Sequence, residues 1–587
     1  MSPEEYTSRK TNKTEQKINA LFTVIIERKG NMKADQIIRN ARIFTADKDN
    51  PHASALVVKD GKFIYAGNEA GLKDYKGEVT DLGGKFIMPG IIDSHVHITT
   101  GVGVDYVEYG KWIDCSGKQE ALDFMTEYIR KNPGKERYRF MLERASLNGE
   151  DFTKEDLDAI CPDHELQILE SEVHSIWVNS RILEKHGVTD DTPDPAPGLA
   201  YYVRKDGHLT GKAYESAGWP FLFDWLRENL TDEQIETAVA RWIDFCKEYG
   251  VSAVFDAGFP EHNDIHERIY SHLRDLDRQG RLPIYVDGCY VLTNHNKIQE
   301  ALEETRRFNR EFNTEHMKVH TLKVFMDGTL KIETAAMVTP YADTGAVGAT
   351  TFNAEEIAQI IKELNEAGLD FHLHTVGERS SRVVLDGVEM ARKELGENFR
   401  VKVTCAHLWV QDDADLDRFA KLGVIANYTP VWHSGTIGGD PYPFWSAIIG
   451  EERAAKMFRC KTVWDSGALV TWSSDEVAYD DFSTWNPYYS MEVGMTRHVS
   501  EKTKAPEVQK TVRVLPPLDE RMNIEEMLTG YTINGAKQLG IEAAKGSIEA
   551  GKDADFLVFD NDLLSAEPVG FSYNMPTDVY FGGKKVN

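Results

Sequence analysis

The middle of the chain alternates short apolar runs with longer amphipathic stretches. Segments such as Ala354–Ala367 and Asp412–Leu422 carry apolar residues at helical spacing and separate most of the runs. Strands that alternate with helices are typical of a parallel α/β sheet, and eight such units predict a closed (β/α)8 TIM barrel. The eight runs are Ile91–Val96, Val251–Phe255, Ile284–Val286, Thr321–Phe325, Leu369–His374, Val401–Ala406, Val424–Ala426 and Leu469–Trp472.

The two ends of the chain have a different pattern, in which short strands surround tight-turn dipeptides. Asp60-Gly61 and Gly582-Gly583 favour two-residue hairpin turns. We therefore predict one small β-sandwich domain built from both termini, residues 32–88 and 540–587. The strands expected around the turns are Ala55–Lys59 and Phe63–Ala66 near the N-terminus, and Asp578–Phe581 and Lys584–Val586 near the C-terminus.

Residues 89–539 are predicted to form the barrel domain, with a large insertion after its first strand. The stretch between Val96 and Val251 is far too long for an ordinary βα loop and has a mixed pattern of its own. We expect this insertion, about residues 100–235, to be a cap subdomain at the active-site mouth. The strand pattern begins soon after Met32, so residues 1–31 are hypothesised to be a disordered N-terminal extension without a structural role.

Composition and charge exclude several classes of protein. The net charge of −28 argues against non-specific binding to nucleic acid or to an anionic membrane, because a negative surface repels phosphate. No apolar run is long enough to span a membrane, and the six cysteines form no CxxC pair. We expect a cytoplasmic protein that acts on a small-molecule substrate and has no nucleic-acid or membrane partner, and we leave a homodimer open.

The strongest local signal for chemistry is Asp93-Ser94-His95-Val96-His97, at the end of the first apolar run. Side chains alternate along a strand, so His95 and His97 point the same way and can chelate one divalent ion. Two hydrogen-bonded histidines would fit this motif equally well. A metal site is favoured because ligand-type residues, rarely buried without partners, also end later runs: His374, His407 and Asp475.

Two neighbouring residues have more than one interpretation. His372 shares a strand face with His374, and we expect it to be packed or hydrogen-bonded rather than a ligand. Lys323 lies inside an apolar run, where burial lowers the pKa of its amine. A neutral amine could react with carbon dioxide to give a carbamate that bridges two metals, but the residues alone favour a lysine paired with Asp475 or another carboxylate.

Aromatic residues are frequent after several of the runs. Together they suggest a pocket for an apolar or aromatic substrate group, although each one alone is better explained by packing of the cap on the barrel. The candidates for the substrate pocket are Tyr106, Tyr109, Trp112, Trp409, Tyr428 and Trp432.

Several segments together resemble a known family. Phe86–His97 reads as an apolar strand, a Pro-Gly turn, an acidic residue and two histidines. On these residues the chain resembles the amidohydrolase superfamily and its third subfamily, which includes N-substituted formamide deformylase-like proteins. The resemblance extends from about Gln36 to Lys584. The other segments that carry it are His174–Ser180, Lys323–Gly328, Thr334–Ala336, His374–Gly377, Gly546–Glu549 and Gly551–Asp555.

The resemblance implies a metal-dependent amidohydrolase that hydrolyses a carbon–nitrogen, amide-type bond of a small molecule with metal-activated water. It implies that His95, His97 and Asp475 hold one divalent ion, expected to be zinc. If two ions are present, His374 and His407 would hold the second, with carboxylated Lys323 as the bridge. Asp475 would move the proton of the attacking water. His174 would contact the substrate carbonyl from the insertion, unless it is a structural histidine of the cap.

Some positions depart from the subfamily pattern and keep other functions open. Ala406 replaces the usual Glu, and Glu172 and Glu378 replace Asp. A mononuclear hydrolytic deaminase typically has a His-x-x-Glu pair after the fifth strand, whereas the spacing here is His374-x-x-x-Glu378, which disfavours it. A non-catalytic regulator on the same barrel is also disfavoured, because such proteins usually lose ligands and every expected position is filled.

Overall fold

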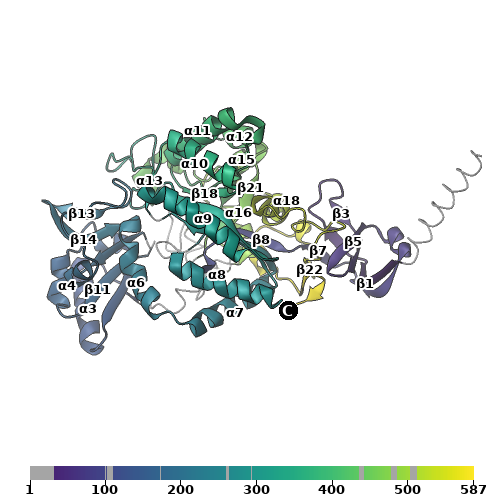
Figure 1. The fold of residues 1–587 in the computed structure, drawn as a ribbon, viewed down its shortest axis with the longest axis horizontal. Helices are drawn as coiled ribbons and strands as arrows, with labels where there is room; N and C mark the ends of the chain where they lie inside the picture. Colours follow the sequence, from purple (N-terminus) through teal and green to yellow (C-terminus); the bar gives the residue numbers. More distant parts are fainter. Residues whose placement is uncertain are drawn as a thin grey trace, which may run out of the picture.

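The centre of the molecule is an eight-stranded parallel barrel (Figure 1). This computed structural model describes residues 32–99, 101, 110–171, 174–258, 263–292, 294–434, 442–476, 486–500, 502 and 512–587. All eight predicted runs are confirmed as its strands, in order, and the TIM barrel is therefore confirmed. The strands are β8 (Ile91–Val96), β15 (Val251–Asp256), β16 (Tyr285–Val291), β17 (Met317–Phe325), β18 (Asp370–Thr375), β19 (Val403–His407), β20 (Ile425–Tyr428) and β21 (Val470–Trp472).

Helices cover the outside of the barrel because their apolar faces match its strands. The helix α10 (Ala354–Ala367) has the predicted bounds. It begins where Asn353 and Glu356 form a reciprocal capping box, and it ends at Gly368, whose φ of 67° is left-handed. The predicted helix Asp412–Leu422 is only half right, because α12 begins at Arg418 after a series of turns.

The barrel closes where its first and last strands meet at their carboxyl ends. The backbone N–H of Asp475 donates to the carbonyl of His95 at 2.9 Å, and that of His97 donates to Glu476 at 3.0 Å. The hydroxyl of Ser94 also donates to the carbonyl of Trp472 at 2.7 Å. These bonds bring the His95–His97 segment beside Asp475.

The insertion forms a separate layered unit at one end of the barrel (Figure 1). Its core residues include Phe140, Leu157 and Ile168, and they form a cluster distinct from the barrel core. Two helices of this unit are α3 (Lys118–Lys131) and α4 (Lys154–Ile160). Its sheet has the order β13-β14-β12-β11-β10-β9, with β9 (Lys111–Trp112), β10 (Arg137–Leu142), β11 (Glu165–Glu170), β12 (Ser175–Val178), β13 (Tyr202–Lys205) and β14 (His208–Tyr214).

Both ends of the chain build a β domain on the other side of the barrel (Figure 1). Its four-stranded sheet has the order β5-β4-β1-β6 and its six-stranded sheet the order β24-β23-β22-β7-β2-β3. One core holds the two sheets together, with Leu56 and Val58 from the first and Ile87 and Val558 from the second. The strands are β1 (Met32–Arg39), β2 (Arg42–Phe44), β3 (His52–Ala53), β4 (Ala55–Lys59), β5 (Lys62–Gly67), β6 (Tyr75–Asp81), β7 (Phe86–Pro89), β22 (Phe556–Phe559), β23 (Asp578–Phe581) and β24 (Lys584–Lys585).

Both predicted hairpin turns are present in this β domain. Asp60 and Gly61 have φ values of 51° and 76°, and Gly582 and Gly583 have values of 54° and 71°. Two left-handed residues in succession are what a type I′ hairpin turn requires. The predicted extension, residues 1–31, lies outside the described residues.

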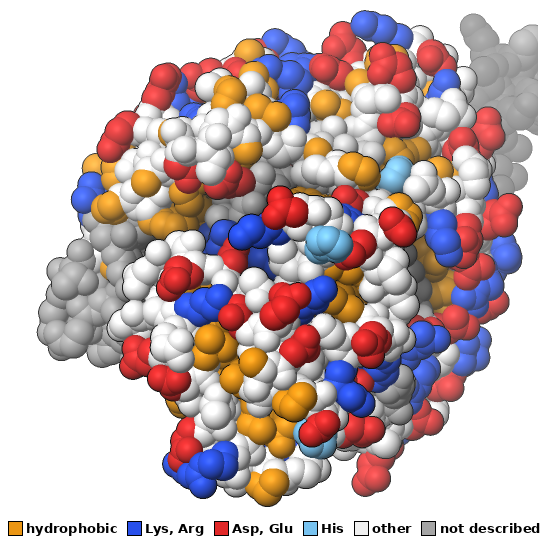
Figure 2. Space-filling model, turned by 90° about the vertical axis from the view of Figure 1, so that its left-hand side faces the viewer, with side chains coloured by type: hydrophobic (Ala, Val, Ile, Leu, Met, Phe, Trp, Pro, Cys, Tyr) orange, Lys and Arg blue, Asp and Glu red, His pale blue; other side chains and the backbone are white. Residues whose placement is uncertain are grey.

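The described surface carries charges of both signs. Figure 2 views the molecule from the side of the insertion and shows acidic and basic side chains interspersed over this face. None of the helices in the described part of the chain is long and apolar enough to cross a membrane.

A half-buried histidine links three barrel strands by two ion pairs. His320 on β17 lies 3.0 Å from an Asp287 oxygen on β16 and 3.3 Å from an Asp370 oxygen on β18. Burial alone would lower the pKa of His320, but the two carboxylates more than offset it and raise that pKa to about 10. The imidazolium therefore stabilises the fold through charge.

We expect His320→Gln to lower the free energy of unfolding by about 3 kcal/mol near pH 6, because the change leaves two carboxylates without their cation. Since the pKa of His320 is raised from 6.5 to about 10, its contribution is complete below about pH 6.5 and is lost as pH rises through about 10. Unfolding followed by circular dichroism across this range measures the difference from the wild type.

The matched control is His316→Gln, because His316 also pairs with an aspartate, Asp277, but its side chain is 37% exposed. It should destabilise the protein less. An equal loss in both variants, or a loss in His320→Gln that does not shrink toward pH 10, would contradict the charge-based account.

Candidate metal centre and active site

Three side chains meet at the closure of the barrel. The Nε2 atoms of His95 and His97 lie 3.4 and 3.5 Å from Oδ1 of Asp475 and 3.4 Å from each other. Their ligand atoms all lie within 4.8 Å of one another, a spacing that could hold one metal ion. The two histidines are buried, and the Asp475 side chain is 20% exposed.

Hydrogen bonds to the far side of each ring determine which nitrogen faces this cluster. Nδ1 of His97 lies 2.7 Å from the carbonyl of Gly258, which can only accept, so Nδ1 carries a proton and Nε2 is the nitrogen that faces the cluster. Nδ1 of His95 lies 2.9 Å from Nε2 of His372. Partners of this kind fix the orientation of a metal-binding imidazole. His372 is thus hydrogen-bonded, as the sequence predicted.

The remaining predicted histidines complete the same cluster. The rings of His374 and His407 lie 4.4 Å apart, and Nδ1 of His407 lies 3.4 Å from Oδ2 of Asp475. Burial, reinforced by Lys323 and neighbouring histidines, holds the pKa of His95, His374 and His407 well below the ordinary value. All three imidazoles are therefore neutral near pH 7, the form that binds metals.

Lys323 lies fully buried beside this cluster. It pairs in register with His372 across β17 and β18, and its Nζ atom has no hydrogen-bond partner among the described residues. Burial lowers the pKa of the amine, nearby Asp475 raises it, and the net value is about 8. The predicted ion pair with a carboxylate is therefore not formed at hydrogen-bond distance.

His174 reaches the cluster from the insertion. Its Nδ1 lies 2.7 Å from Oε2 of Glu215, and its ring lies 6.4 Å from that of His374. The structure thus brings together all the residues predicted for metal binding and catalysis. Their chemical roles stay predictions.

The aromatic residues predicted to form the substrate pocket lie in different environments. Tyr428 is fully buried, and its hydroxyl donates to Gln411 at 2.7 Å while its ring contacts Trp472, so a substrate would not reach it. Trp409 and Trp432 are half-buried with ring centres 6.4 Å apart, and Trp112 is 47% exposed on the edge strand β9. These three stay predictions, and Tyr106 and Tyr109 lie outside the described residues.

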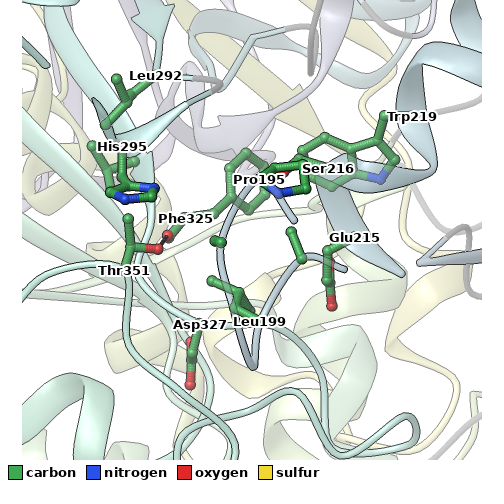
Figure 3. A pocket seen from close by; sticks show the side chains of 13 residues that line it. Pro195, Leu199, Glu215, Ser216, Trp219, Leu292, His295, Phe325, Asp327 and Thr351 are labelled. Atoms are coloured by element: carbon green, nitrogen blue, oxygen red, sulfur yellow. Dashed lines mark hydrogen bonds between the residues drawn. The ribbon is translucent and has the colours of Figure 1, made fainter. Parts of the chain in front are cut away.

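A different hollow adjoins the cluster, between the insertion and the rim of the barrel. It has a volume of about 460 Å3, counting the part open to solvent. Figure 3 shows side chains from both units arranged around this space. None of the described residues that line it is a lysine or an arginine. Its lining includes Leu199, Trp219, Leu292, His295, Val324 and Phe325.

Two rings of this pocket lie next to the histidine cluster. The ring of Phe325 lies 5.3 Å from His374, and that of Trp219 lies 5.0 Å from Phe325. No sequence pattern points to Trp219, because it lies in the insertion, far along the chain from any barrel strand. Phe325 could have been found, since it shares a strand face with Lys323.

Buried carboxylates hold the loops around the site in place through hydrogen bonds. The sequence analysis assigned these residues no such role. Asp327 accepts the backbone N–H groups of Ala336, Val376 and Gly377 at 2.8–2.9 Å. Asp93 accepts the backbone N–H of Ser474 at 3.1 Å and so ties β8 to β21. Asp327 follows the apolar strand β17 and Asp93 lies within the apolar strand β8, which is the available signal, but only the structure separates them from ligands.

Glu378 does not point to the cluster. Its Oε1 accepts the N–H groups of Val338 and Thr339 at 3.3 Å each and lies 3.6 Å from Arg453. The glutamate that a deaminase would place near its metal is therefore engaged with a neighbouring loop.

Several known proteins are similar to this chain in sequence. The profile of the amidohydrolase family (Amidohydro_3) matches residues 78–586. N-substituted formamide deformylase of Arthrobacter pascens is 25% identical over 549 residues, 90% of this chain and 94% of that protein. Exoenzymes regulatory protein AepA of Pectobacterium carotovorum subsp. carotovorum is 28% identical over 422 residues, 68% of this chain and 86% of that protein.

A solved structure shows the same fold. An uncharacterized metal-dependent hydrolase from Pyrococcus horikoshii superposes with a TM-score of 0.63 at 22% identity, covering 91% of this chain and 99% of that one. The family profile covers the whole barrel and the C-terminal strands of the β domain but not residues 36–77, where the resemblance was also expected. The chain belongs to the amidohydrolase family.

Proposed function

We propose that this chain is a metal-dependent hydrolase that cleaves a carbon–nitrogen, amide-type bond of a small molecule with activated water. One observation carries the proposal: imidazoles of His95, His97 and His407 surround the Asp475 carboxylate at the carboxyl end of the barrel, beside a buried lysine whose Nζ has no hydrogen-bond partner among the described residues. Imidazole and carboxylate ligands suit divalent transition metals. Active sites of TIM barrels lie at this end, and membership in the amidohydrolase family supports the same chemistry.

The residues fit one or two divalent ions, for which zinc is the expected metal. His95, His97 and Asp475 would hold the first, since their ligand atoms already converge. His374 and His407 would hold a second, with a carbamate on Lys323 as a shared ligand. An unpaired buried amine is costly, and conversion to a carbamate would turn it into a ligand.

The chain's own residues would then carry the proton. A divalent ion in this site would activate water and polarise the substrate carbonyl. Asp475 orients the water and accepts its proton, because its two oxygens lie among the three imidazoles of His95, His97 and His407. The same carboxyl group passes the proton to the leaving nitrogen. His174 contacts the carbonyl oxygen from the side of His374.

The pocket beside Phe325 supports a neutral, apolar substrate group. Its walls are largely aliphatic and aromatic, and the lining residues offer no cation to pair with a carboxylate. A carboxylate placed there would lose its hydration without compensation, because the acidic residues Glu215 and Asp327 also line the pocket. A relative's name, N-substituted formamide deformylase, refers to amides with a substituent on nitrogen, which suits this arrangement.

A non-catalytic regulator is the competing proposal. One relative is called a regulatory protein, at 28% identity. The convergence of His95, His97 and His407 on Asp475 favours the enzyme, because nothing in a purely structural role requires these residue types at one point.

We expect Lys323→Met to lower bound metal by about one ion per chain and kcat/KM by at least about 100-fold, because the shared ligand is lost. Metal analysis, together with carbon-13 bicarbonate labelling to detect a carbamate, measures this on the same preparation. Lys318→Met is the control, since Lys318 lies exposed on the same strand. Unchanged metal and turnover in Lys323→Met would exclude the bridge, and one ion without a carbamate would favour a deaminase.

Asp475→Asn should reduce turnover far more than metal content. The amide keeps an oxygen that can bind an ion but cannot take up the proton, so we expect a fall in kcat of about 100-fold or more. Steady-state kinetics and metal analysis test this with any substrate found in a panel of amides. Normal hydrolysis by this variant would refute the proton-transfer role.

The pocket predicts a preference by charge. Between two amides that differ only in a remote group, we expect kcat/KM to be about 100-fold higher for the neutral apolar one than for the carboxylate. Ala196→Arg, at the half-buried edge of the pocket, should reduce this ratio about 10-fold. Val569→Arg, at an exposed position, is the control. A ratio that Ala196→Arg leaves unchanged would show that the group binds elsewhere.

A further inference from the structure

A buried carboxylate of the insertion lies between His174 and the barrel. Glu215 is 4% exposed, its Oε2 lies 2.7 Å from Nδ1 of His174, and its Oε1 accepts the hydroxyl of Thr334 at 2.7 Å. Its backbone N–H also donates to the carbonyl of His174 at 2.8 Å. The two residues are therefore joined by backbone and side chain, although they belong to different parts of the insertion.

The carboxylate lies directly against the loop that orients His374. A Cβ atom at Gly328 would fall 2.2 Å from Oε1 of Glu215 and 2.1 Å from Oγ1 of Thr334, so only glycine fits there. The carbonyl of the same Gly328 lies 3.2 Å from Nε2 of His374. One short path of contacts thus connects the imidazole of the insertion to an imidazole of the barrel cluster.

The backbone at Glu215 is held in an unusual conformation. Its φ of 52° is left-handed, a region that costs a non-glycine residue about 1 kcal/mol or more. No lysine or arginine of the described chain lies within ion-pair distance of its carboxylate. A carboxylate that is buried without a permanent cation is expensive, and this cost argues for a role beyond packing.

We propose that Glu215 is a positioning residue that holds His174 at the histidine cluster, so that the insertion completes the active site. This inference rests on the proposed hydrolase function. Because a carboxylate can only accept, it requires a proton of His174 on Nδ1 and so fixes how the ring is turned toward His374. Thr334 fixes the other carboxylate oxygen and thereby sets the direction from which His174 approaches.

The proposal predicts a larger loss of kcat/KM when Glu215 is changed than when Thr334 is changed. Glu215→Gln keeps the shape but can present either an oxygen or an N–H group to His174, so the orientation is no longer enforced. We expect kcat/KM to fall by about 10- to 100-fold, mainly through kcat, with metal content unchanged. Thr334→Val should cost about 3-fold to 10-fold, and Thr334→Ser, which keeps the hydroxyl, should restore activity.

A matched control separates positioning from stability. Glu520 is also a buried carboxylate, 2% exposed, and it accepts from Arg459 and from the backbone N–H of Thr462 outside the site. Glu520→Gln should lower thermal stability but leave kcat/KM of the folded protein within about 2-fold. If Glu215→Gln lowers kcat/KM no more than Glu520→Gln does, or if Thr334→Ser fails to restore activity, the positioning role is refuted.

Hydrogen exchange provides a readout that does not depend on hydrolysis. In Glu215→Gln, peptides that cover residues 174–180 and 326–336 should exchange at least about 10-fold faster than in the wild type or in Glu520→Gln. Unchanged exchange in both peptides would overturn the proposal. If exchange rises as expected while the wild type hydrolyses no amide, the hydrolase function fails and the attachment of His174 by Glu215 still stands.

Discussion

Closure of the barrel between β8 and β21 is the contact on which the site depends. Two backbone hydrogen bonds, from Asp475 to His95 and from His97 to Glu476, join the ends of these strands. Without them, His95 and His97 would not lie beside Asp475. Asp93 reinforces the closure through the backbone N–H of Ser474, a residue 381 positions away. The same bonds that complete the sheet therefore also set the distances among His95, His97 and Asp475.

Sequence reasoning recovers what depends on local periodicity. The eight barrel strands and both hairpins could be predicted because apolar alternation and turn dipeptides are encoded within a few residues. The ligand-type residues could be found for the same reason, since strand carboxyl ends converge in a barrel. The sequence could not show whether Lys323 has a hydrogen-bond partner, because the residues around it come from several strands.

The errors have equally local causes. Tyr428 follows Asn427 on β20, so the two side chains point to opposite faces of the strand. Asn427 donates to Ser94 on β8 across the barrel closure, whereas Tyr428 packs with Trp472, whose ring stacks on Trp464 of the helix α15 (Cys460–Asp465). An aromatic residue at the end of a barrel strand therefore packs against the surrounding helices when its side chain points to the outer face of the strand. The alternation of side chains along the strand could have shown that Tyr428 points outward. Nothing in the sequence identifies Trp219 as a residue of the pocket.

The aspartates at the barrel mouth differ in what their carboxylates contact. This difference distinguishes a possible metal ligand from a residue that holds loops in place. Asp327 cannot serve an ion, because three backbone N–H groups already occupy its two oxygens. Asp475 has a different environment: its carboxylate oxygens lie 3.4–3.5 Å from ring nitrogens of His95, His97 and His407. A cation held between the carboxylate and these nitrogens would be stabilised by all four groups. The left-handed φ values of 80° at His407 and 54° at Asp475 add strain at the same point. Converging ligand atoms and backbone strain together are what a site shaped around a positive ion would accept, and they favour a metal over an inert cluster of histidines.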